Sequence, residues 1–153
     1  LVIAPHVVSD SHLKEILDKV KRPCIRYTEA TEENVTQADC LIIDCYGLLS
    51  SIYRYGEISY IGGGFGVGIH NVLEAAVYGI PVIFGPNNKK FREAQHLLEQ
   101  KGGFEVIGYD DFKRLMDKFL SDEAYLQQAG KAAGNYVNHN AGALEKIMKD
   151  ITL

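Results

Sequence analysis

Short apolar runs alternate with longer amphipathic segments along most of the chain. The runs are rich in β-branched residues and almost continuously hydrophobic, which is typical of strands that are covered on both faces. They lie at residues 1–4, 24–28, 40–44, 58–62, 81–85 and 104–108. Segments with helical spacing lie between them. This strand-then-helix order predicts an α/β fold, a Rossmann-like parallel sheet flanked by helices.

The helical segments are expected at residues 11–21, 69–79, 90–101 and 109–120. Ser9 or Ser11 is suited to cap the first of them, because a short hydroxyl side chain can accept a hydrogen bond from the first helical turn. From Ser121 onward the strand pattern stops, and two more helices that meet near Asn140 are expected. No linker or repeat interrupts the chain, so we predict a single domain over 1–153 with a helical C-terminal tail.

Five glycines lie between the fourth apolar run and the helix that follows it: Gly62, Gly63, Gly64, Gly66 and Gly68. Ordering glycine is entropically costly, so such a cluster needs a reason. In parallel α/β sheets, ligands bind at loops that follow the carboxyl ends of strands, and helix N-termini attract anions. We therefore expect a phosphate-binding loop, with a tight turn as the alternative. The P-loop and dinucleotide-binding glycine motifs are both absent.

The helix after the loop carries three polar side chains on one side, Asn71, Glu74 and Tyr78, at spacings i, i+3 and i+7. An ionised carboxylate only accepts hydrogen bonds, so Glu74 suits the two hydroxyl groups of a ribose whose phosphate lies on the loop. The alternative is a solvated helix carboxylate. His70 is either a donor to the same phosphate or an exposed histidine.

Composition narrows the choice of partners. The chain has 153 residues, 46% hydrophobic and 24% charged, with a net charge of -4, which is ordinary for a globular protein. The acidic balance argues against a nucleic-acid partner, and no apolar run approaches the roughly 18 residues of a membrane span. The chain begins with "LVIAP", inside a predicted strand and without Met, so we expect a soluble fragment of a longer protein.

Three cysteines, Cys24, Cys40 and Cys45, include no CxxC pair. They indicate free thiols in a reducing compartment, such as the cytoplasm. A metal site from Cys40, Cys45 and a histidine is the weaker alternative, and no metal is predicted.

The glycine loop, the helix with its glutamate and the segment "GIPVIFGP" together resemble the donor-nucleotide half of GT-B glycosyltransferases. More narrowly, residues 44–99 resemble the 3-deoxy-D-manno-octulosonic acid (Kdo) transferases, and the likeness extends over most of residues 1–108. The matching positions are Asp44, Gly47, Leu49, Gly62, Gly63, Phe65, Gly68, Asn71, Leu73, Glu74, Gly79, Pro81, Val82, Phe84, Gly85 and Pro86.

The resemblance implies the C-terminal domain of a GT-B enzyme that binds CMP-Kdo without a cofactor. The full-length transferase would pass Kdo to the lipid A precursor in lipopolysaccharide biosynthesis, at the cytoplasmic face of the bacterial inner membrane. The implied nucleotide contacts are Gly62, Gly63, Gly64, Phe65, Asn71, Glu74 and His6. The catalytic base of the family is a glutamate in the N-terminal half, which we expect to lie outside this chain. No catalytic residue is therefore expected here, and the chain alone is expected to be inactive and to partner its own N-terminal domain.

The chain departs from the family pattern at several positions. His6 directly follows Pro5 where the family often has Pro-Arg-His, Leu48 replaces a glutamate, and Asn87 and Lys90 stand where histidine and asparagine are common. These departures affect contacts with Kdo or the acceptor more than the CMP site. The alternatives are the nucleotide-binding half of another GT-B enzyme, such as a UDP-sugar transferase or a UDP-N-acetylglucosamine 2-epimerase relative, and a non-catalytic nucleotide-sensing domain.

Overall fold

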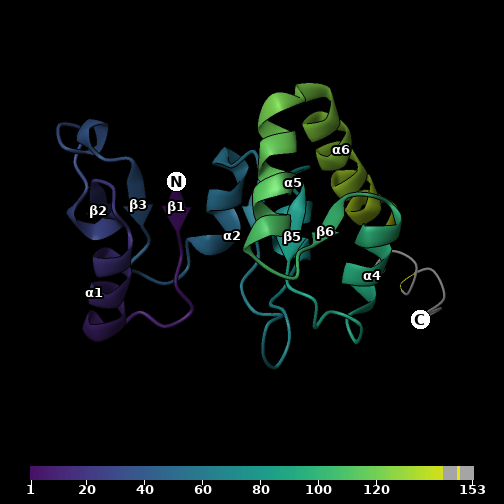
Figure 1. Ribbon diagram of the computed structural model, residues 1–153, viewed down its shortest axis with the longest axis horizontal. Helices are drawn as coiled ribbons and strands as arrows, with labels where there is room; N and C mark the ends of the chain where they lie inside the picture. Colours follow the sequence, from purple (N-terminus) through teal and green to yellow (C-terminus); the bar gives the residue numbers. More distant parts are fainter. Residues whose placement is uncertain (143–147, 149–153) are drawn as a thin grey trace. The chain divides into compact units, whose positions relative to one another are not determined.

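The computed structural model describes residues 1–142 and 148. The chain divides into two compact units, residues 1–52 and 53–153, which run from purple to blue and from teal to yellow in Figure 1. Each unit has a parallel sheet of three strands.

The first unit has the strand order β1-β3-β2. Its strands are β1 (Val2–Ile3), β2 (Cys24–Arg26) and β3 (Cys40–Ile42), and Cys24 lies opposite Cys40 in the register. Helix α1 (Asp10–Lys19) is capped by Ser9, whose hydroxyl accepts a hydrogen bond from the His12 backbone N–H. Its buried residue Leu13 packs against Cys40 and Ile42 to form the core. Short helices η1 (Tyr27–Glu29), η2 (Val35–Gln37) and α2 (Leu49–Ile52) complete the unit.

Asp44 ties together the carboxyl ends of β2 and β3. Its carboxylate accepts hydrogen bonds from the backbone N–H and the hydroxyl of Thr28, at 3.0 Å and 2.6 Å. Burial acts to raise the pKa of Asp44, but the two Thr28 bonds, together with the backbone N–H of Asp44 and the charge of Arg26, hold this pKa below its ordinary value. Asp44 is one of the positions at which the sequence resembles the Kdo transferases, and in this structure its role is to join parts of the first unit.

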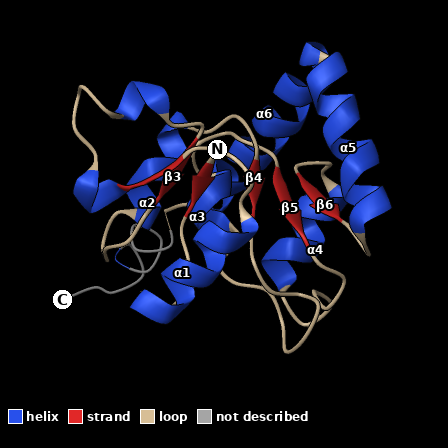
Figure 2. Ribbon diagram, turned by 60° about the vertical axis from the view of Figure 1, so that its left-hand side comes forward, coloured by secondary structure: helices blue, strands red, loops and turns tan. Residues whose placement is uncertain are grey.

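The second unit has the strand order β4-β5-β6. The strands are β4 (Ser59–Tyr60), β5 (Val82–Phe84) and β6 (Gly103–Glu105), preceded by the short helix η3 (Tyr53–Tyr55). Figure 2 shows the three parallel strands side by side, with β5 in the centre. The central strand is completely buried, as its run of hydrophobic residues predicts.

Four helices cover this second sheet: α3 (Leu73–Ala76), α4 (Arg92–Glu99), α5 (Tyr109–Ser121) and α6 (Glu123–Asn140). Side chains of a strand alternate between its two faces, and β5 follows this rule. Val82 and Phe84 pack in one core with residues of α3, α4 and α6, whereas Ile83 packs in another with residues of α5 and α6.

The predicted strands all occur, in the predicted order and with parallel pairing, so the α/β fold is confirmed. Helices α1, α4, α5 and α6 also lie where they were expected. The second helix of the tail falls mostly outside the described residues, and the single-domain organisation stays a prediction. In the described part of the chain, no helix has the length and apolar character needed to cross a membrane.

Candidate functional site

The glycine loop forms a small hairpin after β4. Its two sides are joined by hydrogen bonds from the Gly64 N–H to the Gly68 carbonyl (2.6 Å) and from the His70 N–H to the Gly62 carbonyl (3.2 Å). Between these bonds, Gly63 lies opposite Ile69. Gly63 and Gly64 have positive φ angles of 87° and 80°, a backbone conformation that residues other than glycine rarely adopt.

The two positive-φ glycines approach other parts of the protein backbone. A Cβ atom on Gly63 would lie 2.2 Å from the Gly68 carbonyl oxygen, and one on Gly64 would lie 2.7 Å from the Gly85 Cα atom. Folding of the loop alone therefore explains these glycines, and their contact with a phosphate stays a prediction. Gly66 differs, because a Cβ atom there would meet nothing within 4 Å. At Gly66 the backbone is open to a ligand.

The segment after β5 supports the hairpin from one side. The Asn87 backbone N–H donates to the Gly64 carbonyl at 2.8 Å, and the Asn87 side-chain amide donates to the Gly66 carbonyl at 2.7 Å. These two bonds leave the tip of the hairpin with a defined shape. Lys89 and Lys90 follow in the same segment and are exposed.

The tip of the hairpin carries unused donors. In the described part of the chain, the backbone N–H groups of Phe65, Gly66 and Val67 donate no hydrogen bond to the protein, and all three residues are exposed. Successive backbone N–H groups in a turn form concave sites for anions. These three N–H groups are therefore available to donate to an oxyanion of a ligand.

Helix α3 begins later than expected. The sequence predicts a helix from residue 69, but α3 starts at Leu73 and has only four residues, so the prediction of a long helix directly after the loop was wrong. The reason is local: the Asn71 side-chain oxygen accepts the Leu73 backbone N–H at 3.0 Å, a turn that competes with helix formation. A helix this short has little macrodipole, so the loop itself has to supply the attraction for an anion.

Asn71 and Glu74 are brought together as predicted. The Asn71 side-chain amide donates to one Glu74 carboxylate oxygen, Oε1, at 3.0 Å. Asn71 is the residue after His70, whose N–H closes the hairpin, so the pair lies immediately beyond the loop. The half-buried Glu74 is also close to Tyr53: burial raises the pKa of the Tyr53 phenol, and the Glu74 charge raises it further. Tyr78 lies beyond the end of α3, with the Arg54 guanidinium 6.0 Å from its ring.

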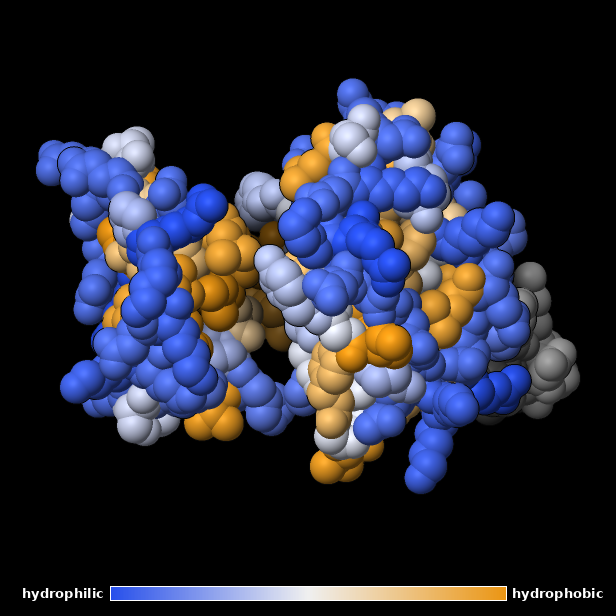
Figure 3. Space-filling model, viewed as in Figure 1, coloured by the Kyte–Doolittle hydropathy of each residue, from blue (hydrophilic) through white to orange (hydrophobic). Residues whose placement is uncertain are grey.

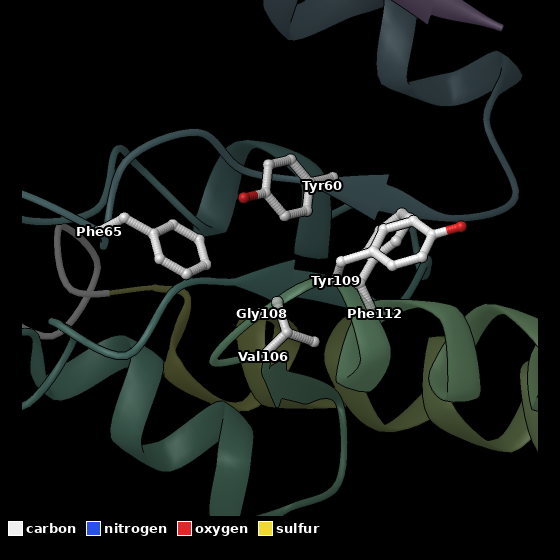
Figure 4. Close-up of a pocket in the computed structure, with 6 residues that line it drawn as sticks. All are labelled: Tyr60, Phe65, Val106, Gly108, Tyr109 and Phe112. Carbon is white, nitrogen blue, oxygen red and sulfur yellow. The ribbon is translucent and has the colours of Figure 1, made fainter.

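A hollow that the sequence did not predict lies next to the hairpin. It has a volume of about 440 Å³ and is lined by Tyr60, Phe65, Val106, Gly108, Tyr109 and Phe112. Figure 4 shows Phe65 and Tyr60 on the hairpin side and Tyr109 and Phe112 on the α5 side. The Tyr60 and Phe112 rings pack edge to face, with their centroids 5.7 Å apart. Phe65 thus joins the hairpin to an aromatic surface. In the sequence, only its position among the glycines indicated that it belongs to a site.

Exposed apolar side chains continue around this hollow. Phe65 is 55% exposed and Tyr109 is 74% exposed, and Figure 3 shows hydrophobic surface over this part of the second unit. An exposed apolar surface beside unpartnered backbone N–H groups is typical of a binding region.

The remaining predicted contact, His6, belongs to the first unit. It lies between β1 and α1 and is exposed, and its assignment to the nucleotide stays a prediction. In the described part of the chain, no three histidine, cysteine or acidic residues are grouped so that they could hold a metal ion.

The known proteins similar to this chain include several 3-deoxy-D-manno-octulosonic acid transferases. A 3-deoxy-D-manno-octulosonic acid transferase from Aquifex aeolicus is 37% identical over 87 residues, covering 56% of this chain and 25% of the relative. The enzyme of the same name from Rickettsia felis is 28% identical over 149 residues, covering 92% of this chain and 31% of the relative. The chain thus spans about a quarter to a third of the length of these relatives. No protein-family model matches it.

A solved structure has the same fold. The C-terminal CMP-Kdo binding domain of WaaA from Acinetobacter baumannii superposes with a TM-score of 0.72 and 18% sequence identity, covering 89% of this chain and 72% of that domain. At this identity the likeness establishes the architecture, and it confirms the expected GT-B C-terminal fold.

Proposed function

We propose that this chain, a relative of the 3-deoxy-D-manno-octulosonic acid transferases, binds the nucleotide of CMP-Kdo as the donor-binding part of such an enzyme. The observation that carries the proposal is the hairpin tip, where three successive exposed N–H groups at Phe65, Gly66 and Val67 have no partner within the described residues. The tip follows the carboxyl end of a parallel strand, which is where α/β sheets bind their ligands.

The phosphate of CMP would accept hydrogen bonds from these N–H groups. The ribose would then extend toward Glu74. Asn71 already donates to Oε1 of that carboxylate, so the second oxygen and the remaining lone pairs are left to accept from the two ribose hydroxyls. In this role Asn71 is a positioning residue that fixes the orientation of the carboxylate, and Gly62 to Gly64 supply the shape of the hairpin.

The full-length protein would transfer Kdo from CMP-Kdo to the lipid A precursor in lipopolysaccharide biosynthesis. The transfer would take place at the cytoplasmic face of the inner membrane. The catalytic base and most of the acceptor contacts would come from a separate N-terminal domain, with which this chain would form the donor site.

A GT-B enzyme that uses a UDP-sugar is the second candidate. It would place the same phosphate on the same hairpin and the same ribose on Glu74, so the two candidates differ only in the base and in the number of phosphates. The name that both relatives carry favours a Kdo donor, and the solved domain of the same fold is described as binding CMP-Kdo.

The test is to titrate CMP into isotopically labelled protein and to follow the backbone amide resonances. We expect the largest shifts at Phe65, Gly66 and Val67, with a second group at Glu74. Cytidine, which lacks the phosphate, is the control and should leave the hairpin amides unmoved. Shifts confined to the aromatic hollow, or equal shifts with cytidine, would contradict the proposed phosphate site.

A further inference from the structure

Asn88 is a polar side chain that the folded chain buries almost completely, at 1% exposure. Its amide nitrogen donates to the Gly85 carbonyl at 2.9 Å and to the Glu105 carboxylate at 2.6 Å. Its side-chain oxygen accepts from the Gln95 amide at 2.5 Å. Both amide hydrogens and the oxygen are therefore used, as a buried amide requires.

The partners of Asn88 come from three different elements. Gly85 directly follows β5, Gln95 lies in α4 and Glu105 ends β6. A buried polar group that loses its partners costs more than the bond itself is worth, and a fully satisfied network holds its members in one arrangement. The Gln95–Asn88–Glu105 network thus fixes the segment Gly85–Asn88 to the rest of the second unit.

This fixed segment is the one that holds the glycine hairpin. Gly85 lies directly against the backbone of Gly64, and Asn87 bonds to the carbonyls of Gly64 and Gly66. A movement of the segment would therefore be passed to the hairpin tip, although Asn88, Gln95 and Glu105 have no contact with the tip itself among the bonds described.

We infer that Asn88 is a positioning residue, which acts through Asn87 and Gly85 to keep the hairpin N–H groups arranged for a phosphate. The inference rests on the proposed nucleotide site, but its structural half concerns the hairpin alone. It assigns to Gln95 and Glu105 the same indirect effect on ligand affinity.

The test uses the variants Asn88→Ala, Glu105→Ala and Glu105→Gln. The Gln variant keeps an oxygen that accepts from Asn88 and should behave like the wild type. Asn88→Ala removes three hydrogen bonds and Glu105→Ala removes one. Both Ala variants should bind CMP about three- to tenfold more weakly, because binding then has to order a looser hairpin. Phe119→Leu, a core change in α5 that removes none of the hydrogen bonds of the network, is the control for lost stability. It should leave CMP affinity unchanged.

A second measurement needs no ligand. The Gly64, His70 and Asn87 amides donate the bonds that close and support the hairpin, so their hydrogen-exchange rates report its order. These rates should rise in Asn88→Ala and Glu105→Ala, relative to amides within α5, and stay near wild type in Glu105→Gln and Phe119→Leu. Unchanged hairpin exchange in Asn88→Ala would refute the positioning role. If wild-type protein shows no affinity for CMP but the exchange rates respond as expected, then the nucleotide proposal fails and the positioning of the hairpin stands.

Discussion

Gly64 and Gly85 touch through their backbones. A Cβ atom built on either residue would lie 2.7 Å from a backbone atom of the other, so no side chain fits at either position. The contact joins the loop after β4 to the segment after β5, and it holds the glycine hairpin at the edge of the sheet. Gly64 therefore serves to bring two loops together, and a ligand would approach the backbone at Gly66, where a Cβ atom would meet nothing.

Gly64 and Gly66 should respond differently to replacement by alanine. Gly64→Ala forces a Cβ atom into the Gly85 backbone and strains a positive φ angle, so we expect a loss of about 1–3 kcal/mol in the free energy of unfolding. Gly66→Ala places its methyl group in open space and should leave stability nearly unchanged. If phosphate lies against the hairpin tip, Gly66→Ala should still weaken CMP binding by about tenfold, or about 1.4 kcal/mol.

Urea unfolding and calorimetric CMP titration of both variants make this comparison. Unchanged CMP affinity in a stable Gly66→Ala variant would show that no ligand approaches the tip. A valine at Gly63 or Gly64 does not isolate the ligand, because it disrupts the hairpin even in the free protein.

Glu74→Gln should weaken CMP binding without unfolding the protein. Glutamine keeps the size of the side chain and an oxygen that can accept from Asn71, but it loses the charge. Hydrogen bonds to a charged group are worth about 1.5–3 kcal/mol, so CMP affinity should fall roughly 10- to 150-fold. The loss should shrink sharply for 2′,3′-dideoxy-CMP, which has no ribose hydroxyls. Equal losses for the two ligands, measured by calorimetry, would rule out the ribose contact.

Gly130 and Gly79 form a second close backbone contact, between α6 and the turn after α3. A Cβ atom on Gly130 would lie 2.2 Å from the Gly79 carbonyl oxygen. Gly130→Ala should therefore reduce the free energy of unfolding by about 1–3 kcal/mol, despite the higher helix propensity of alanine. Gln128→Ala, at an exposed position of the same helix, is the control and should be neutral or slightly stabilising. A Gly130→Ala variant as stable as this control would show that α6 packs differently.

Asp44 should titrate below its ordinary range. Because the folded pKa is lowered, the bonds from Thr28 contribute stability above the unfolded pKa of about 3.9, and this contribution is lost as the pH falls through the folded pKa. An NMR titration of the Asp44 side-chain carboxyl carbon should give a midpoint below that of an aspartate in an unfolded chain. Thr28→Val removes the hydroxyl bond and should move the midpoint upward. A midpoint that does not change would mean that Thr28 has no effect on this carboxylate.

The hydrophobic pattern was enough to locate the strands, because each is a buried run with a glycine, proline or polar boundary. The pattern overestimated the length of α3, because the short Asn71 side chain bonds to the backbone two residues later and forms a turn there. Such a turn does not change the spacing of the apolar residues, so the pattern could not reveal it. The pairing of Asn71 with Glu74 could be predicted because it needs only three residues of separation.

Contacts between distant segments could not be predicted. Nothing in the sequence distinguishes the buried Asn88 from its exposed neighbour Asn87, since burial depends on where α4 and β6 lie. The aromatic hollow likewise combines Phe65 of the hairpin with Tyr109 and Phe112 of α5, which lie more than forty positions away. The glycine pair Gly64 and Gly85 depends on two loops that meet only in the folded chain.

An assay of Kdo transfer tests whether catalysis depends on the proposed N-terminal domain. The chain alone should transfer no Kdo from CMP-Kdo to a lipid A precursor, because the proposed base and acceptor surface belong to the N-terminal domain. The measurement is product formation by mass spectrometry, with a full-length relative as the positive control. Product formed by this chain alone would mean that it contains its own catalytic base.

Calorimetric titration of this chain with CMP, CDP, UMP and UDP is the decisive test for a nucleotide site of CMP-Kdo in the second unit. We expect CMP to bind with a measurable dissociation constant, more tightly than UMP or UDP, and Glu74→Gln to weaken this binding. Tighter binding of UDP would point to a UDP-sugar enzyme, and the absence of heat with all four nucleotides would contradict the site itself.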